Sequence, residues 1–237
     1  MMVHPDAIIA AQFPPMPSEQ RLDLLIEAME AAIAPGGTLV IPTFSYSFTK
    51  GEPFDVLRTG SMVGMVSERF RTMRRVCRTS DPIFSFACRG SRAAEFCAAP
   101  TQECFGRQSV FGLLHRSNAH IVDLGCSMNR GGTFVHYVET AHGVTYRYNK
   151  SFSGTLITSD RQRHACSVVY NVRDLTRKSE ADLRRLQSRL IAEGKLRSVE
   201  VGRSRIMAAA AQDLFDTAWT MLDEDPVSLI AEGADPE

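Results

Sequence analysis

The chain has no excess of either charge, no recognisable targeting segment and no long apolar run. Lys and Arg together number 27, and Asp and Glu also number 27. A formal charge of zero gives no argument for binding to nucleic acid or to an anionic membrane. The first residues lack a basic region followed by an apolar core, and no apolar stretch approaches the ~20 residues that span a bilayer. We therefore expect a cytoplasmic protein with neither nucleic acid nor membrane as a partner.

The six cysteines are too scattered to predict a metal centre. They form no C-x-x-C pair and have no histidine at zinc-ligand spacing, so no metal is expected. A disulfide framework is not expected in a cytosolic chain of this size. Cys126 is the exception, because it follows an expected strand at a turn, where His136 could activate it. A cysteine hydrolase using Cys126 and His136 is therefore one alternative function.

The overall amino-acid composition is that of an ordinary globular protein. Hydrophobic residues make up 44% and charged residues 23% of the 237 residues. The chain is long enough to bury a sizeable core, and it has neither an internal repeat nor a low-complexity linker. We expect a single domain over residues 1–237 with a helical C-terminal part.

The first half of the chain predicts an α/β unit. Residues 18–34 have apolar side chains at helical spacing, with Ser18 as a possible cap. Pro35-Gly36-Gly37 ends this helix, and the apolar run 38–41 predicts a buried strand. The loop 42–49 then follows at the end of the strand where open α/β sheets bind ligands. Its hydroxyls and aromatic rings could line a pocket or form a packed turn.

Residues 58–71 predict a second helix, opened by Thr59 or Ser61. Its apolar face would hold Met62, Met65, Val66 and Phe70. Small residues at a helix start leave backbone N–H groups that favour a phosphate or a polar amide ligand. A basic cluster accompanies it, which is usually a solvated face but could also receive phosphates: Arg69, Arg71, Arg74, Arg75 and Arg78.

The remaining pattern alternates strands and helices. We expect a strand over 82–90, a helix from Ser109, and a buried strand at 121–124. Antiparallel strands are expected next, and two helices after them. The strands are 146–148, 154–158 and 166–172, and the helices are 175–193 and 203–222.

The most informative segment is 121–139. Its apolar run is followed by a turn rich in Gly, Ser and Asn, and then by helix-compatible sequence that carries His136 and Glu139. Side chains three residues apart on a helix share one face, so Glu139 could orient His136. Imidazole titrates near neutrality and can accept a proton from an amine. A single histidine near a helix start is more often a cap or a surface residue, so this pattern gives only a candidate site.

In this order, the motifs resemble the aminoglycoside 3-N-acetyltransferase family and its sugar-modifying relatives. The resemblance covers most of the chain. The matching segments are 36–44, 61–71, 78–87, 105–114, 124–139, 146–147 and 204–229, with Asp225-Pro226 near the end of the last.

The resemblance implies a three-layer α/β/α sandwich with a central mixed sheet. It also implies direct acyl transfer from an acyl-CoA co-substrate to an amino group of a sugar, with His136 as general base and Glu139 as its partner. The residues implied at the pantetheine arm and carbonyl of the donor are Thr43, Ser45, Gly60, Ser61, Met62 and Val63. Those implied at the acceptor are Asp81, Ser109 and Tyr137.

Three departures from the family pattern shape the substrate prediction. Asp81-Pro82 replaces a His-Pro pair of antibiotic-modifying members, and Val3-His4-Pro5-Asp6 replaces Val-His-Ser. We expect the helix and strand that precede this segment in members to be missing. Arg173 and the charged helix up to residue 193 look like relatives that acylate nucleotide-linked amino sugars.

We therefore expect an N-acyltransferase for a nucleotide-linked amino sugar, with aminoglycoside 3-N-acetylation and antibiotic resistance as the alternative. A noncatalytic ligand-binding protein is a third hypothesis, motivated by Asp81 and the short start. A homodimer is also expected, because helix 203–222 would carry an exposed apolar stripe.

Overall fold

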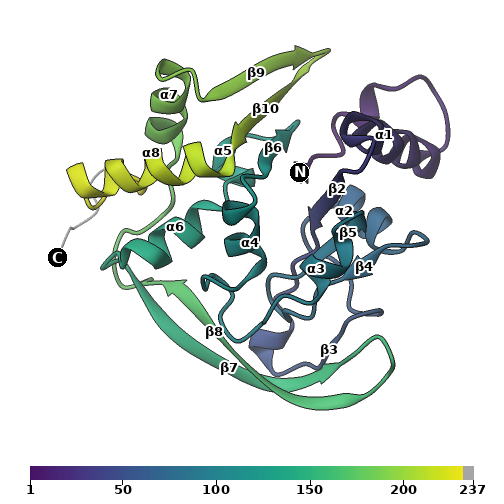
Figure 1. Cartoon of the computed structure of the whole chain (residues 1–237), viewed down its shortest axis with the longest axis horizontal. Helices are drawn as coiled ribbons and strands as arrows, with labels where there is room; N and C mark the ends of the chain where they lie inside the picture. The colour runs from purple at the N-terminus through teal and green to yellow at the C-terminus, as the bar shows by residue number, and fades with distance from the viewer. Residues whose placement is uncertain (232–237) are drawn as a thin grey trace.

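A seven-stranded mixed sheet forms the centre of the molecule. The computed structural model describes residues 1–231 of the chain, and Figure 1 shows the arrangement. The strands in spatial order are β4 (Cys77–Arg78), β5 (Phe86–Gly90), β2 (Thr38–Pro42), β1 (Met2–Pro5), β6 (His120–Leu124), β10 (Ser204–Ala210) and β9 (Leu196–Val201).

The three middle strands are parallel and the outer ones are antiparallel. β1 pairs in parallel with both β2 and β6, whereas β5 and β10 run against their neighbours. Every residue of β1 and β2 is buried, as expected for strands covered on both faces. The carboxyl ends of β1, β2 and β6 therefore meet at one edge, where open α/β sheets bind ligands.

Two helices cover one face of the sheet. They are α1 (Ser18–Ile33) and α2 (Met65–Arg71), which contact each other. The predicted apolar stripe of the first helix is confirmed, since Leu22, Leu25, Ile26 and Met29 are all buried. Their core contains Val3, Leu39 and Ile41 of the sheet, because alternate strand residues point to opposite faces.

The other face carries the remaining helices. These are α3 (Ala93–Cys97), α4 (Val110–Arg116), α5 (Met128–Gly131), α6 (Val135–His142), α7 (Arg184–Ala192) and α8 (Ala211–Glu224). α8 contacts α4, α6 and α7, so it closes this layer (Figure 1). The predicted three-layer α/β/α fold with a central mixed sheet is confirmed.

A long hairpin forms a second sheet outside the layers. β7 (Arg147–Ile157) and β8 (Arg163–Arg173) pair along their whole length, and β3 (Phe54–Asp55) joins β7 in parallel. The hairpin curves along the lower side of the molecule in Figure 1. The predicted antiparallel strands are confirmed, although two continuous strands replace three short ones. Two short 3-10 turns, Ala10–Gln12 and Phe48–Lys50, complete the described elements.

The prediction of one helix over 203–222 was wrong at its start. Residues Ser204–Ala210 form β10, and only Ala211–Glu224 is helical. The alanine-rich run favours helix locally, but pairing with β6 on one side and β9 on the other outweighs that propensity. In the predicted apolar stripe Phe215 is half-buried, and the other five residues are buried: Met207, Ala211, Leu214, Ala218 and Leu222. The helix predicted over 175–193 is confined to Arg184–Ala192.

The second predicted helix begins later than its sequence suggested. α2 starts at Met65, because Gly64 has φ +125°, a conformation incompatible with a helix. Val66 and Phe70 are buried as predicted, but Met62 and Met65 are 61% and 60% exposed. The expected helix start at Thr59 or Ser61 is therefore a loop.

Cys77 and Cys97 form a disulfide, with their Cα atoms 6.5 Å apart. A disulfide framework was not expected in a cytosolic chain of this size, and this pairing corrects that expectation for one bond, since the fold brings β4 and α3 together. Cys88, Cys104, Cys126 and Cys166 are free thiols. Within residues 1–231, no helix is long and apolar enough to cross a membrane.

Candidate active site

His136 and Glu139 are paired on α6, as their spacing predicted. His136 Nδ1 lies 2.7 Å from Glu139 Oε2. Glu139 is only 1% exposed, whereas the His136 side chain is partly accessible. A buried carboxylate that holds one ring nitrogen of a partly exposed histidine fixes the direction in which the other nitrogen points.

The first residues of the hairpin complete this buried group. Tyr146 donates its hydroxyl to Glu139 Oε1 at 2.9 Å, and Arg147 Nε lies 2.7 Å from Glu139 Oε2. Tyr146-Arg147 matched the family pattern in the sequence, but no role was predicted for either residue. Only the fold brings the start of β7 against the middle of α6.

The proton on His136 can be assigned from its two neighbours. Arg147 Nη2 also lies 2.7 Å from His136 Nδ1. An ionised carboxylate can only accept a hydrogen bond, so the contact with Glu139 requires a proton on Nδ1, whereas the contact with Arg147 Nη2 requires Nδ1 to accept. We assign the proton to Nδ1, because Arg147 also pairs with the Glu139 carboxylate through Nε. In this tautomer Nε2 of His136 is the unprotonated nitrogen.

The electrostatics favour a neutral imidazole beside an ionised carboxylate. Burial and the charge of Arg147 lower the pKa of His136, and these effects outweigh the raising effect of Glu139. Burial by itself would raise the pKa of Glu139, but hydrogen bonds from His136 and Tyr146 and the charge of Arg147 hold it below its usual value. His136 is thus available as a base at neutral pH.

A cleft of about 350 Å³ opens at the carboxyl ends of the parallel strands; we call it the strand-end cleft. It is lined by His4, Pro5, Asp6, Ala7, Pro42, Phe44, Tyr46, Val63, Gly64, Met65, Ser67, Cys126, Arg130 and Thr133. The backbone oxygen of Thr133 accepts a hydrogen bond from His136 N at 3.1 Å. The cleft therefore ends one helical turn before the candidate base.

Most of the residues predicted to bind the acyl donor do not line this cleft. Of the six, Val63 lines it directly. Thr43 and Ser45 are buried, and their hydroxyls bond to Ser85 and Ser47. Their role is therefore to hold the loop after β2 in shape.

Gly60, Ser61 and Met62 lie in the loop before α2. Ser61 N donates to Glu68 Oε2 at 2.7 Å, and Met62 N donates to the backbone oxygen of Phe44. Ser61 and Met62 line a shallow hollow shared with α1, outside the strand-end cleft. These residues shape the rim of the cleft without lining it.

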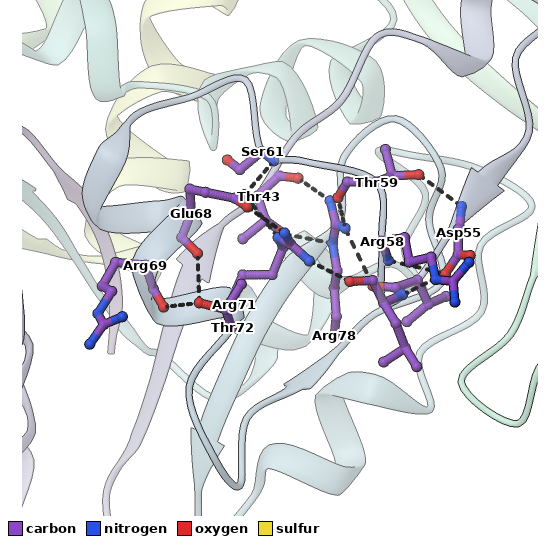
Figure 2. Close-up of polar contacts among 12 residues, drawn as sticks. Thr43, Asp55, Arg58, Thr59, Ser61, Glu68, Arg69, Arg71, Thr72 and Arg78 are labelled. Atoms are coloured by element: carbon purple, nitrogen blue, oxygen red, sulfur yellow. Dashed lines mark hydrogen bonds and ion pairs between the residues drawn. The ribbon is translucent and has the colours of Figure 1, made fainter. Parts of the chain in front are cut away.

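The basic cluster near α2 is mostly a structural network. Arg78 is buried and donates to Thr43 O at 2.7 Å and to Thr59 O, which ties two loops together (Figure 2). Arg71 pairs with Glu68, and Arg69 pairs with Asp23. These three arginines therefore form neither the solvated face nor the phosphate site that the sequence suggested as alternatives. Arg74 and Arg75 are exposed.

The predicted acceptor residues Asp81 and Ser109 are brought together, but apart from His136. They line the same small buried hollow. Asp81 Oδ1 accepts Ile83 N and Phe84 N at 2.8 Å each, and burial raises the pKa of Asp81. The Ser109 hydroxyl caps α4 by accepting from Gly112 N. Both side chains are therefore engaged in local structure.

A line of aromatic rings connects the strand-end cleft to the candidate base. Phe44 lines the cleft and packs against Phe84, with ring centres 5.0 Å apart. Phe84 contacts Phe105 at 4.6 Å, and Phe105 contacts the His136 ring at 5.6 Å. The rings come from three separate segments, so no sequence signal identified this wall.

A second cleft, of about 470 Å³, lies along α6 and α8; we call it the α8 cleft. Its lining is Glu103, Phe105, Gly106, Arg107, His115, Arg116, Tyr137, Thr140, Ala141 and Phe215. Thr140 Oγ1 donates to His136 O at 2.7 Å. Tyr137, a predicted acceptor residue, lies here with its hydroxyl 3.4 Å from His115 Nδ1. His136 itself lines neither cleft, but its neighbours on α6 line this one and Phe105 of the lining contacts its ring.

The structure does not support the cysteine hydrolase hypothesis. Cys126 lines the strand-end cleft, but its Sγ lies near His4 O and Asp123 Oδ1, not near His136. Burial and nearby Asp123 raise the pKa of Cys126 to about 12, so its thiol stays protonated at neutral pH. Across the described residues, no group of three or more His, Cys, Asp or Glu side chains could hold a metal ion.

Known proteins of one family match the chain over most of its length. The family model for aminoglycoside 3-N-acetyltransferase matches residues 12–223. Aminoglycoside N(3)-acetyltransferase IV of Salmonella sp. is 28% identical over 206 residues, which cover 86% of this chain and 74% of the relative.

Solved structures of this group share the fold. The aminoglycoside acetyltransferase AAC(3)-IVa apoenzyme has a TM-score of 0.74 at 24% identity, covering 99% of this chain and 86% of the other. AAC-IIIb, solved as a binary complex with CoASH, has a TM-score of 0.78 at 17% identity, covering 94% and 89%. The predictions of fold and of N-acyl transfer agree with these findings, and by the extent of the family match the chain belongs to the aminoglycoside 3-N-acetyltransferase family.

Proposed function

We propose that this protein transfers an acetyl group from acetyl-CoA to an amine of an aminoglycoside, with His136 as the general base. The observation that carries the proposal is the buried Glu139 carboxylate 2.7 Å from His136 Nδ1, an arrangement that suits Nε2 as the proton acceptor. Family membership supports N-acetylation. Relatives of the same fold were solved with CoASH and with apramycin, which supports the two substrate classes.

The chemistry of amide formation requires these parts. A sugar amine arrives largely as an ammonium ion and cannot attack a thioester until it loses a proton. Nε2 of His136 accepts that proton, and such a base typically contributes about 10² to 10⁴ in rate. The thioester is already activated, so the amine attacks it directly and no protein nucleophile is needed.

We place the acyl donor in the strand-end cleft. The cleft is bordered by Val63 and the start of α2, where the first backbone N–H groups of a helix lack intrahelical partners. Such groups can stabilise the oxyanion that forms when the amine attacks. The aromatic wall from Phe44 to Phe105 separates this cleft from the hollow of Asp81 and leads to the base.

The test is acceptor-dependent release of CoA thiol. Wild-type protein with acetyl-CoA should release thiol in the presence of apramycin or gentamicin, and His136→Ala should lose about 10² to 10⁴ of kcat. His142→Ala is the matched control, because His142 lies on the same helix but bonds to Asp223. Full activity in His136→Ala, with both variants folded, would remove His136 from the mechanism.

A nucleotide-linked amino sugar is the second candidate acceptor. The observation that favours it is the charge of the hairpin, which carries Arg147, Lys150, Arg161, Arg163 and Arg173 against Asp160. Arg147 and Arg161 are paired with Glu139 and Asp55, whereas Arg173 lies 3.9 Å from the exposed Glu180. The charge that remains at the end nearest the base is therefore that of Lys150 and Arg173, which favours an anionic sugar diphosphate over a polycationic aminoglycoside. The same thiol assay with UDP- and dTDP-linked amino sugars decides between them by kcat/KM.

We also propose that residues 1–237 act as one acyltransferase domain. The family match from 12 to 223 runs through both helical layers and the hairpin, so no separate unit is needed. Limited proteolysis of the full chain should give a single resistant core. Two separately stable fragments would contradict this proposal.

A further inference from the structure

The α8 cleft has an aromatic floor that the proposed chemistry does not use. His115 and Phe215 are stacked, with ring centres 4.1 Å apart and planes inclined by 17°. Tyr137 packs against both rings, and Phe105 closes the side toward His136. All four rings line the cleft, and because Phe215 is itself stacked against both His115 and Trp219, a planar ligand on this floor would stack on His115.

Two arginines stand at the rim of this floor. Arg107 and Arg116 are exposed and line the cleft, and Arg116 Nη1 donates to the backbone oxygen of Arg107. Within residues 1–231, neither guanidinium has a carboxylate at ion-pair distance, whereas Arg130 of the strand-end cleft pairs with Asp6. Glu103 is the one carboxylate in the lining, so the cleft keeps an excess of one positive charge.

The cleft is adjacent to the candidate base. Tyr137, Thr140 and Ala141 of its lining belong to α6, and Thr140 Oγ1 bonds to the backbone of His136. Phe105 contacts both the cleft and the His136 ring. The cleft is therefore next to the candidate base, with the Phe105 ring between them.

We propose that the α8 cleft binds the nucleotide part of a substrate, with a base on the His115–Phe215 floor and phosphates at Arg107 and Arg116. Stacking on aromatic rings recognises any nucleobase, and guanidinium groups suit phosphate because they donate two parallel hydrogen bonds. This inference rests on the proposed function, since it assigns a cleft beside the same base. The nucleotide has two chemical sources: the adenosine diphosphate end of CoA, or the nucleoside diphosphate of a sugar acceptor.

The experiment measures nucleotide binding by calorimetry, with tryptophan fluorescence reporting the location. Trp219 is the only tryptophan of the chain and stacks on Phe215 at 5.5 Å, so a ligand in the cleft should change its emission. The probes are adenosine 3′,5′-diphosphate, UDP and CoA. In R107Q/R116Q we expect about a tenfold or greater rise in Kd for the nucleotide that belongs here, because two charge-assisted contacts are lost.

The matched control is R197Q/R203Q, which removes two exposed arginines outside both the cleft and the hairpin. It should leave Kd within about twofold, because single exposed charges far from a ligand are screened by salt. If both double variants weaken binding equally, the effect is one of bulk charge and the proposal fails. It also fails if neither adenosine 3′,5′-diphosphate nor UDP binds wild-type protein, or if R107Q/R116Q binds both as tightly.

The two sources give different patterns. If adenosine 3′,5′-diphosphate competes with CoA and R107Q/R116Q weakens both, the cleft takes the donor. If UDP binds in the presence of saturating CoA and only UDP is weakened, the cleft takes the acceptor. Thiol release with aminoglycosides is measured on the same proteins. If no nucleotide binds in the α8 cleft but thiol release persists and depends on His136, this inference is overturned and the proposed function stands.

Discussion

His136 Nδ1 and Glu139 Oε2 lie 2.7 Å apart, and the glutamate is almost completely buried. Arg147 and Tyr146 occupy the remaining sides of the same carboxylate. A carboxylate buried in this way remains ionised only because three donors surround it. Each of these donors therefore contributes to the basicity and orientation of His136, and substitutions in the group should have separable effects.

Glu139→Gln should reduce kcat less than His136→Ala does. The amide keeps an oxygen that can accept the Nδ1 proton, so orientation is partly preserved, while the charge that supports the imidazolium is lost. Steady-state kinetics of both variants with one acceptor give the comparison. Wild-type rates in Glu139→Gln would remove Glu139 from the site, and a loss as large as that of His136→Ala would mean that it does more than orient.

Arg147→Gln should move the acid limb of the kcat/KM profile to higher pH. Burial and Arg147 lower the pKa of His136, so the wild-type limb is expected below the ordinary value of ~6.5. Removing the cation stabilises the imidazolium, raises the pKa of His136, and makes more of the base inactive in mild acid. Arg173→Gln is the control, because Arg173 has a smaller influence from farther away. A limb that stays in place, or moves to lower pH, would contradict the assignment.

Arg78→Met should destabilise the fold, by about 1 to 3 kcal/mol for each buried oxygen that is left without its donor. Arg78 joins the loop after β2 to the loop before α2 through Thr43 and Thr59 (Figure 2). Urea denaturation measures the change in unfolding free energy. Arg74→Met is the matched control, since Arg74 is an exposed arginine four residues earlier. Equal effects of the two substitutions would show that the loop contacts contribute little.

Asp123→Asn should stabilise the protein at alkaline pH. Burial raises the pKa of Asp123 to about 7, so the folded state binds this proton more tightly than the unfolded state, in which the pKa is ~3.9. The stability that the group contributes is complete below ~3.9 and is lost as pH rises through about 7. The difference between variant and wild type should therefore grow from about pH 4 to about pH 7 and then level off, reaching at most on the order of 4 kcal/mol. A difference that is constant with pH would contradict this prediction.

The predictions from sequence were best where a local pattern and the fold agree. The stripe of Leu22, Leu25, Ile26 and Met29 predicted α1, and the apolar runs predicted β2 and β6. The spacing of His136 and Glu139 predicted their contact, because three residues on one helix fix a short distance. The prediction failed at 204–210, where alanines favour a helix but two neighbouring strands pair with the segment.

By itself, the sequence determined the family, the layered α/β fold and the pair His136–Glu139, because ordered motifs and helical spacing are local properties of the chain. The tertiary structure alone decided which groups surround that pair. Arg147 and Tyr146 arrive from a hairpin, Phe105 arrives from a loop, and the two clefts are each built from segments far apart in sequence. Such contacts depend on how strands and helices pack, and no periodicity along the chain encodes them.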